Sequence, residues 1–82
     1  MLLASAANTL APAFQALKSK GFAIQRRVST SGLEEWRATR DDIILVGDDP
    51  LELLGLATLF QDRGEKWRAS DAELQEFMKI LA

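Results

Sequence analysis

The chain has 82 residues, which is enough for one small domain over residues 1–82 and too short for two hydrophobic cores. Its composition is 48% hydrophobic and 27% charged, as in folded globular proteins rather than disordered ones. The net charge is only −2, and cysteine, histidine and tyrosine are absent, which excludes thiolate catalysis, cysteine-ligated metals and histidine-based acid–base chemistry.

The composition also bears on where the protein works. Residues 1–7 lack the basic segment and the long apolar run of a secretory signal. No stretch approaches the roughly 18 apolar residues that a membrane-spanning helix needs. Small domains without cysteine are typical of reducing compartments. We therefore expect a cytoplasmic protein with no membrane segment, no metal and no cofactor.

The first element expected is a helix over about residues 9–20. Thr9 is a favourable N-cap residue, and Gly21 is a natural residue to follow the last helical turn. Helical spacing then gives one apolar stripe, formed by Leu10, Ala13, Phe14 and Leu17. Residues 1–8 either extend this helix or fray as an N-terminal arm.

Three short strands are expected next, over residues 22–28, 33–39 and 43–46. Turn-forming residues separate them at Ser29–Gly32 and at Asp41–Asp42. The connections are short, so the strands form an antiparallel meander. Alternation predicts the inward side chains, which are Phe22, Ile24, Val28, Trp36 and Ala38.

Two helices complete the chain. Asp49 is a strong N-cap, Pro50 suits the first helical position, and this helix should stop at Gly64. Ser70 and Glu73 have the spacing of a capping box, which opens a last helix. That helix carries one apolar stripe, made of Leu74, Phe77, Met78 and Leu81. The order αβββαα indicates the α+β class.

The paired acidic residues resemble cation ligands but sit in the wrong places for one site. Asp41–Asp42 and Asp48–Asp49 bracket a strand, which separates them by roughly 20 Å. One pair suits a turn and the other a helix cap. Val46–Pro50 also resembles a phosphate-binding loop, but its two carboxylates would repel a phosphate, and the lysine of such loops is missing. We expect neither a metal nor a nucleotide site.

Arginines gather around one aromatic residue in the predicted meander. The group consists of Arg26, Arg27, Arg37 and Arg40, beside Trp36. Arginines around an exposed aromatic side chain can hold single-stranded nucleic acid. The chain is acidic overall, however, and Glu34 and Glu35 stand among the arginines, which also fits a solvent-exposed sheet face with cross-strand ion pairs.

The third strand carries the hypothesis of function. Residues 43–46 are apolar on both faces, yet a simple meander leaves this strand at the edge of the sheet, where charge or proline is usual. The helix over residues 51–60 also has an unusually wide apolar arc. Something should therefore cover this apolar strand. The covering element is either internal, through another strand order or the last helix, or external, through a second subunit or a partner's strand.

We interpret the chain as a non-catalytic protein-interaction module of adaptor, inhibitor or immunity type that binds a protein partner or itself as a homodimer. The apolar part of the expected interaction surface consists of Ile43, Leu45, Leu56 and Leu59. Its polar rim consists of Arg27 and Arg37. Two alternatives stay open. One is a small acid–base enzyme or ligand binder that uses Asp or Glu with Arg, and the other is a weak binder of single-stranded nucleic acid.

Overall fold

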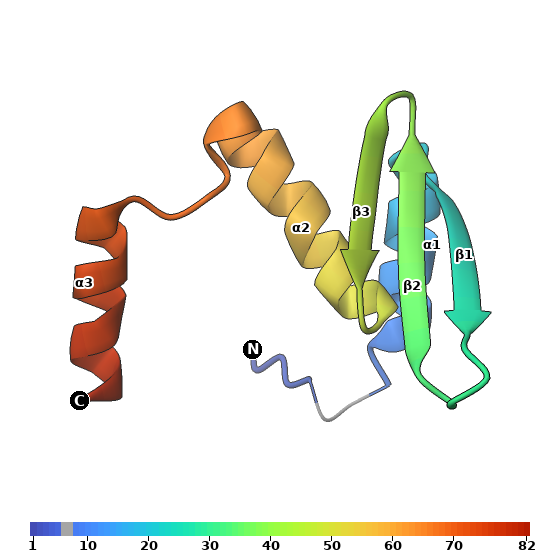
Figure 1. Cartoon of the computed structure of the whole chain (residues 1–82), viewed down its shortest axis with the longest axis horizontal. Coiled ribbons are helices and arrows are strands. Elements are labelled where there is room, and N and C mark those ends of the chain that lie inside the picture. The colour runs from blue at the N-terminus through green and yellow to red at the C-terminus, as the bar shows by residue number, and fades with distance from the viewer. Residues whose placement is uncertain (6–7) are drawn as a thin grey trace.

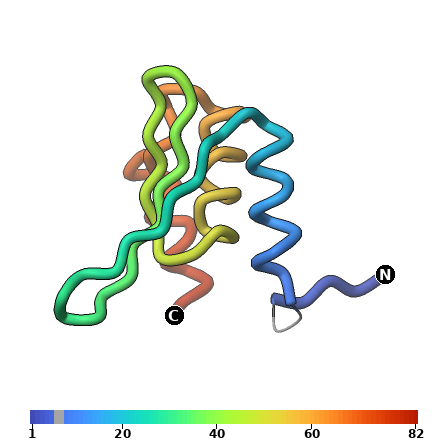
Figure 2. Tube along the Cα trace, turned by 90° about the vertical axis from the view of Figure 1, so that its right-hand side faces the viewer, coloured from blue at the N-terminus to red at the C-terminus, as the bar shows by residue number. Residues whose placement is uncertain are grey.

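A computed structural model describes residues 1–5 and 8–82 and confirms the α+β class and the order αβββαα. The elements in Figure 1 are α1 (Leu10–Ser19), β1 (Ala23–Val28), β2 (Glu34–Arg40), β3 (Ile43–Gly47), α2 (Pro50–Arg63), a 3-10 turn η1 (Gly64–Lys66) and α3 (Asp71–Leu81). The strands form an antiparallel sheet in the order β1–β2–β3, so β3 is an edge strand. Helices α1 and α2 pack on one face of this sheet (Figure 2).

Helix α1 begins and ends where the sequence predicts. Thr9 occupies the N-cap position as predicted, but its side chain makes no capping hydrogen bond because its backbone is already helical. At the other end Gly21 adopts a φ of +91°, and the N–H of Phe22 donates to the carbonyl oxygen of Leu17 at 3.1 Å. Of residues 1–8, the described ones precede the helix, while Ala6 and Ala7 lie outside the described residues.

The side chains that the sequence predicts to face inward lie on the helix-facing side of the sheet. Ala38 lies at its centre, paired with Ile24 on one side and Leu45 on the other, and is fully buried. Trp36 also packs against the core. Val28 is the exception among the inward residues: it is exposed because the β1–β2 hairpin extends beyond the helices that cover the rest of the sheet (Figure 2).

The core is small and lies between the sheet and the two helices. Its buried members are Leu17, Phe22, Ala38, Leu45, Leu53 and Ala57. Leu17 and Leu53 are completely enclosed, one from each helix. A core of this size gives a domain of modest stability.

The start of α2 follows the predicted cap chemistry. Asp49 Oδ1 accepts a hydrogen bond from the N–H of Glu52 at 2.9 Å, and Pro50 occupies the first turn. The Glu52 carboxylate in turn accepts from the N–H of Asp48 at 3.1 Å. The helix ends before Gly64, whose φ is +61°. The acidic residues 48–49 therefore act in the helix cap.

Candidate functional site

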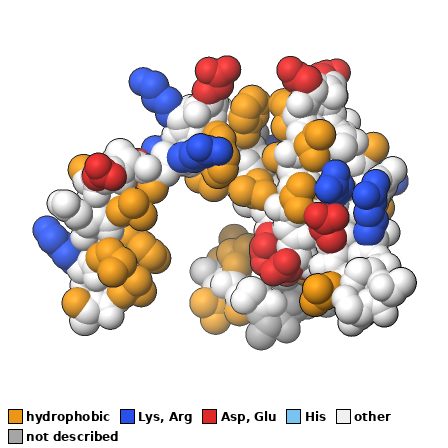
Figure 3. All heavy atoms as spheres, viewed as in Figure 1, with side chains coloured by type: hydrophobic (Ala, Val, Ile, Leu, Met, Phe, Trp, Pro, Cys, Tyr) orange, Lys and Arg blue, Asp and Glu red, His pale blue; other side chains and the backbone are white. Residues whose placement is uncertain are grey.

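Helix α3 stands apart from the rest of the protein. It projects from the end of α2 on the side away from β3, and the space-filling view shows open space between α3 and the body (Figures 1 and 3). Within the described part of the chain, no residue of α3 is buried. Its four apolar stripe residues, called here the α3 stripe, are all at least half exposed: Leu74, Phe77, Met78 and Leu81.

The start of α3 is nevertheless fixed to the end of α2. Arg63 Nη2 donates to Glu73 Oε1 at 2.8 Å and contacts the carbonyl oxygen of Arg68 at 3.4 Å. Glu73 also completes the predicted capping box with Ser70, where both reciprocal hydrogen bonds are present. The hydrogen bond from Arg63, followed by the one from the Ser70 N–H, lowers the pKa of Glu73 to about 2.

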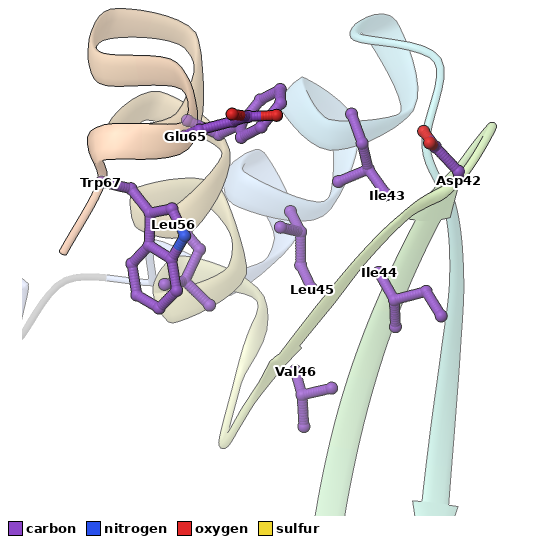
Figure 4. A pocket seen from close by; sticks show the side chains of 9 residues that line it. Asp42, Ile43, Ile44, Leu45, Val46, Leu56, Glu65 and Trp67 are labelled. Carbon is purple, nitrogen blue, oxygen red and sulfur yellow. The ribbon is translucent and has the colours of Figure 1, made fainter.

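A shallow apolar groove of about 520 Å³ runs between α2 and the edge strand β3, and we call it the α2–β3 groove (Figure 4). Its lining is Asp42, Ile43, Ile44, Leu45, Val46, Leu56, Phe60, Glu65 and Trp67. Figure 4 shows Trp67 beside Leu56 on the helical side, while Ile43 and Leu45 point from β3 toward them. Its acidic residues are Asp42, at the start of β3, and Glu65, in η1 after α2.

The structure brings together part of the interaction surface expected from the sequence. Ile43, Leu45 and Leu56 all line the α2–β3 groove. Leu45 is buried in the core, and Ile43 and Leu56 are half-buried against it, so these side chains form the floor of the groove as well as part of the fold. Leu59 lies on an exposed part of α2 outside the groove lining, at 40% exposure.

The expected polar rim lies on another face. Arg37 and Arg27 alternate with the core-facing residues and so occupy the open face of the sheet, away from α1 and α2. Arg37 is paired in register with Val46 and forms an ion pair with Glu35 at 3.3 Å. Arg27 lies on β1, across from Glu35 and farther from the groove.

The aromatic residue of the nucleic-acid alternative is separated from these arginines. Trp36 faces the helices, and its Nε1 donates to Glu34 Oε1 at 2.7 Å. The same carboxylate accepts from Arg26 Nε at 2.7 Å, which, with the Trp36 contact, lowers the pKa of Glu34. Arg40 stacks on the Phe22 ring at 4.5 Å from its centroid, a contact inside the fold.

The sequence predicted Leu56 on the helical side of the groove but not Phe60 and Trp67, nor the exposure of the last helix. Phe60 and Trp67 lie on either side of the helix end at Gly64, and only the structure shows that both turn toward β3. The α3 stripe was visible as a pattern, but such a stripe normally packs on its own domain. Its exposure is a tertiary property that periodicity does not report.

Across residues 1–5 and 8–82, the structure contains no cluster of three or more acidic side chains placed to hold a metal ion. In the same residues no helix is both long enough and apolar enough to cross a membrane. Comparison of the chain with protein families, with curated proteins and with solved structures found no match. The exposed surfaces of the chain itself are therefore the guide to its function.

Proposed function

We propose that this chain is a non-catalytic protein-interaction module, of adaptor, inhibitor or immunity type, that acts in the cytoplasm and binds through the α3 stripe and the α2–β3 groove. The observation that carries the proposal is the exposure of the α3 stripe. Phe77, at its centre, is 56% exposed. Contiguous exposed apolar residues framed by polar ones mark interaction sites in folded proteins.

The length of α3 gives a second argument for a partner. The helix has 11 residues, and isolated helices shorter than about 12–15 residues are marginal in water. Its capping box and the ion pair with Arg63 stabilise the first turn, but nothing among the described residues buries the stripe. Burial of these half-exposed side chains in a partner supplies about 1 kcal/mol each, roughly 4 kcal/mol in all.

The acid–base alternative has less support. A general acid or base at neutral pH needs a carboxyl group whose pKa is raised, usually by burial in a pocket. The carboxyl groups with clear shifts, Glu34 and Glu73, have lowered pKa values because arginines donate hydrogen bonds to them. Such shifts are typical of ion pairs that hold a structure together.

Photo-cross-linking in cells that make the protein tests the proposal. The photoreactive residue p-benzoylphenylalanine, which adds a benzoyl group to the phenylalanine ring, replaces Phe77 in the stripe. In a matched control it replaces Glu76 on the opposite side of the same helix. We expect a defined cross-linked protein from position 77 and none from position 76, with the product identified by mass spectrometry. Equal or absent cross-linking at both positions contradicts a role of the stripe in binding.

A further inference from the structure

We infer that the stripe and the groove bind each other between two copies of this chain, so that α3 of each copy lies in the α2–β3 groove of the other. The inference rests on the proposed function, because it names the partner of that same surface. Among residues 1–5 and 8–82, nothing covers the apolar face of α3 or fills the apolar groove. A twofold dimer satisfies both at once, since each copy supplies one helix and one groove.

The dimensions of the two surfaces agree. Helix α3, with 11 residues, is about 16 Å long. Strand β3, which forms one wall of the groove, has 5 residues and spans about 17 Å. The α3 stripe extends from Leu74 to Leu81, two turns of helix. The groove presents Ile43 and Leu45 from β3, and Leu56, Phe60 and Trp67 from its helical side.

The attachment of α3 favours the groove of another copy over its own. Arg63, in the last turn of α2, holds Glu73 in the first turn of α3 and contacts the carbonyl of Arg68 between them. These contacts keep α3 on the side of α2 away from β3 (Figure 1). The stripe therefore stays off the body of its own chain and is open to a second molecule (Figure 3).

The area available is that of a weak, reversible dimer. Covering the exposed part of the α3 stripe removes about 300 Å² from water, and the groove, which is shallow, loses about half as much. Two such contacts related by a twofold axis bury roughly 900 Å² in total, the size of a weak or transient interface. The exposed edge of β3, which natural proteins normally protect, is covered in the same step.

Two variants separate the two sides of this contact. Phe77→Lys places a charge in the α3 stripe, in a helix with no buried residue. Phe60→Lys places a charge in the groove, at a half-buried position outside the core cluster. Trp67→Lys is a second groove variant if Phe60→Lys fails to fold by circular dichroism. Glu76→Lys, on the opposite face of α3, is the matched control.

Sedimentation equilibrium of the full chain gives the result. We expect the wild type and Glu76→Lys to have twice the chain mass, and Phe77→Lys and Phe60→Lys each to weaken self-association by at least about 30-fold. An equimolar mixture of Phe77→Lys and Phe60→Lys should recover dimers, because the intact helix of one variant fits the intact groove of the other. The mixed dimer keeps only one of the two helix-in-groove contacts. Its affinity should therefore lie between those of the wild type and of either variant alone.

Three results overturn the inference. A wild type that stays monomeric at high micromolar concentration excludes the second copy as partner. Mixed variants that do not recover dimers indicate instead helix-to-helix contact or pairing of two β3 edges. A Phe77→Lys variant that dimerises normally removes the stripe from the interface. The proposed function is judged separately, since cross-linking from position 77 to a different protein would support it even if the chain is monomeric.

Discussion

Two leucine-to-alanine substitutions distinguish the core of this protein from its exposed helix. Leu53, on α2, is completely buried. Leu53→Ala loses the free energy of burying the removed methyl and methylene groups and leaves a cavity beneath the sheet. Together these two effects destabilise a protein by about 3–4 kcal/mol. For a chain of 82 residues the total stability is roughly 4–12 kcal/mol, so this one change removes a large fraction of it.

Leu74→Ala makes the same chemical change on α3, where the side chain is 50% exposed. In a monomer we expect it to change the free energy of unfolding by less than about 0.5 kcal/mol, because it touches no core residue and alanine favours helix. Urea denaturation at low protein concentration measures both values. At high concentration Leu74→Ala should also become less stable than the wild type, since a protein that self-associates is stabilised by its partner.

One pattern of results would contradict an exposed α3. In this pattern, Leu74→Ala lowers the free energy of unfolding as much as Leu53→Ala does, at concentrations where the protein is monomeric. Helix α3 would then pack on its own body, and its stripe would be part of the core. A matched loss in both variants would also remove the basis of the proposed function. If Leu74→Ala lowers the free energy of unfolding only slightly at every concentration, then α3 is exposed but does not bind a second copy of the chain.

Three further predictions concern local structure. The pKa of Glu73 is lowered to about 2, so its carboxylate stabilises the start of α3 fully above its ordinary pKa of about 4.5, and this stabilisation is lost as the pH falls toward 2. NMR should show α3 fraying over this pH range, and Glu73→Gln should remove the pH dependence. Leu45→Lys should unfold the protein, since Leu45 is buried, whereas Ile44→Lys, 60% exposed, should leave the urea midpoint nearly unchanged. Asp49→Ala removes the side-chain cap of α2 and should cost about 1 kcal/mol in thermal unfolding.

Local sequence signals predicted most of the fold. Helix caps depend on a few neighbouring residues, which is why the Ser70–Glu73 box and the Asp49 cap were found from spacing alone. Gly21 and Gly64 end their helices with a positive φ, as expected for residues without a Cβ. Thr9 is the N-cap residue as predicted, but it makes no capping hydrogen bond because its backbone is already helical, which the residue type does not determine.

The candidate site was less predictable because it depends on how far elements lie from one another. The apolar run of β3 correctly marked an edge strand with too much apolar surface. Which of its residues face α2 was not apparent, so Leu45, a core residue, was grouped with exposed ones. Arg27 and Arg37 were expected as the polar rim of this surface, but they lie on the open face of the sheet, which does not border the groove. The separation of α3 from the body has no local signal.

The central claim is that α3 of one copy contacts the groove of another, and isotope-filtered NMR tests it directly. In a sample that mixes ¹³C-labelled and unlabelled chains, we expect nuclear Overhauser effects between the Phe77 ring of one copy and the methyl groups of Ile43 and Leu56 of the other. The filter selects contacts between differently labelled molecules. The same contacts seen only within one molecule, or not at all under conditions where the chain is folded, contradict the account.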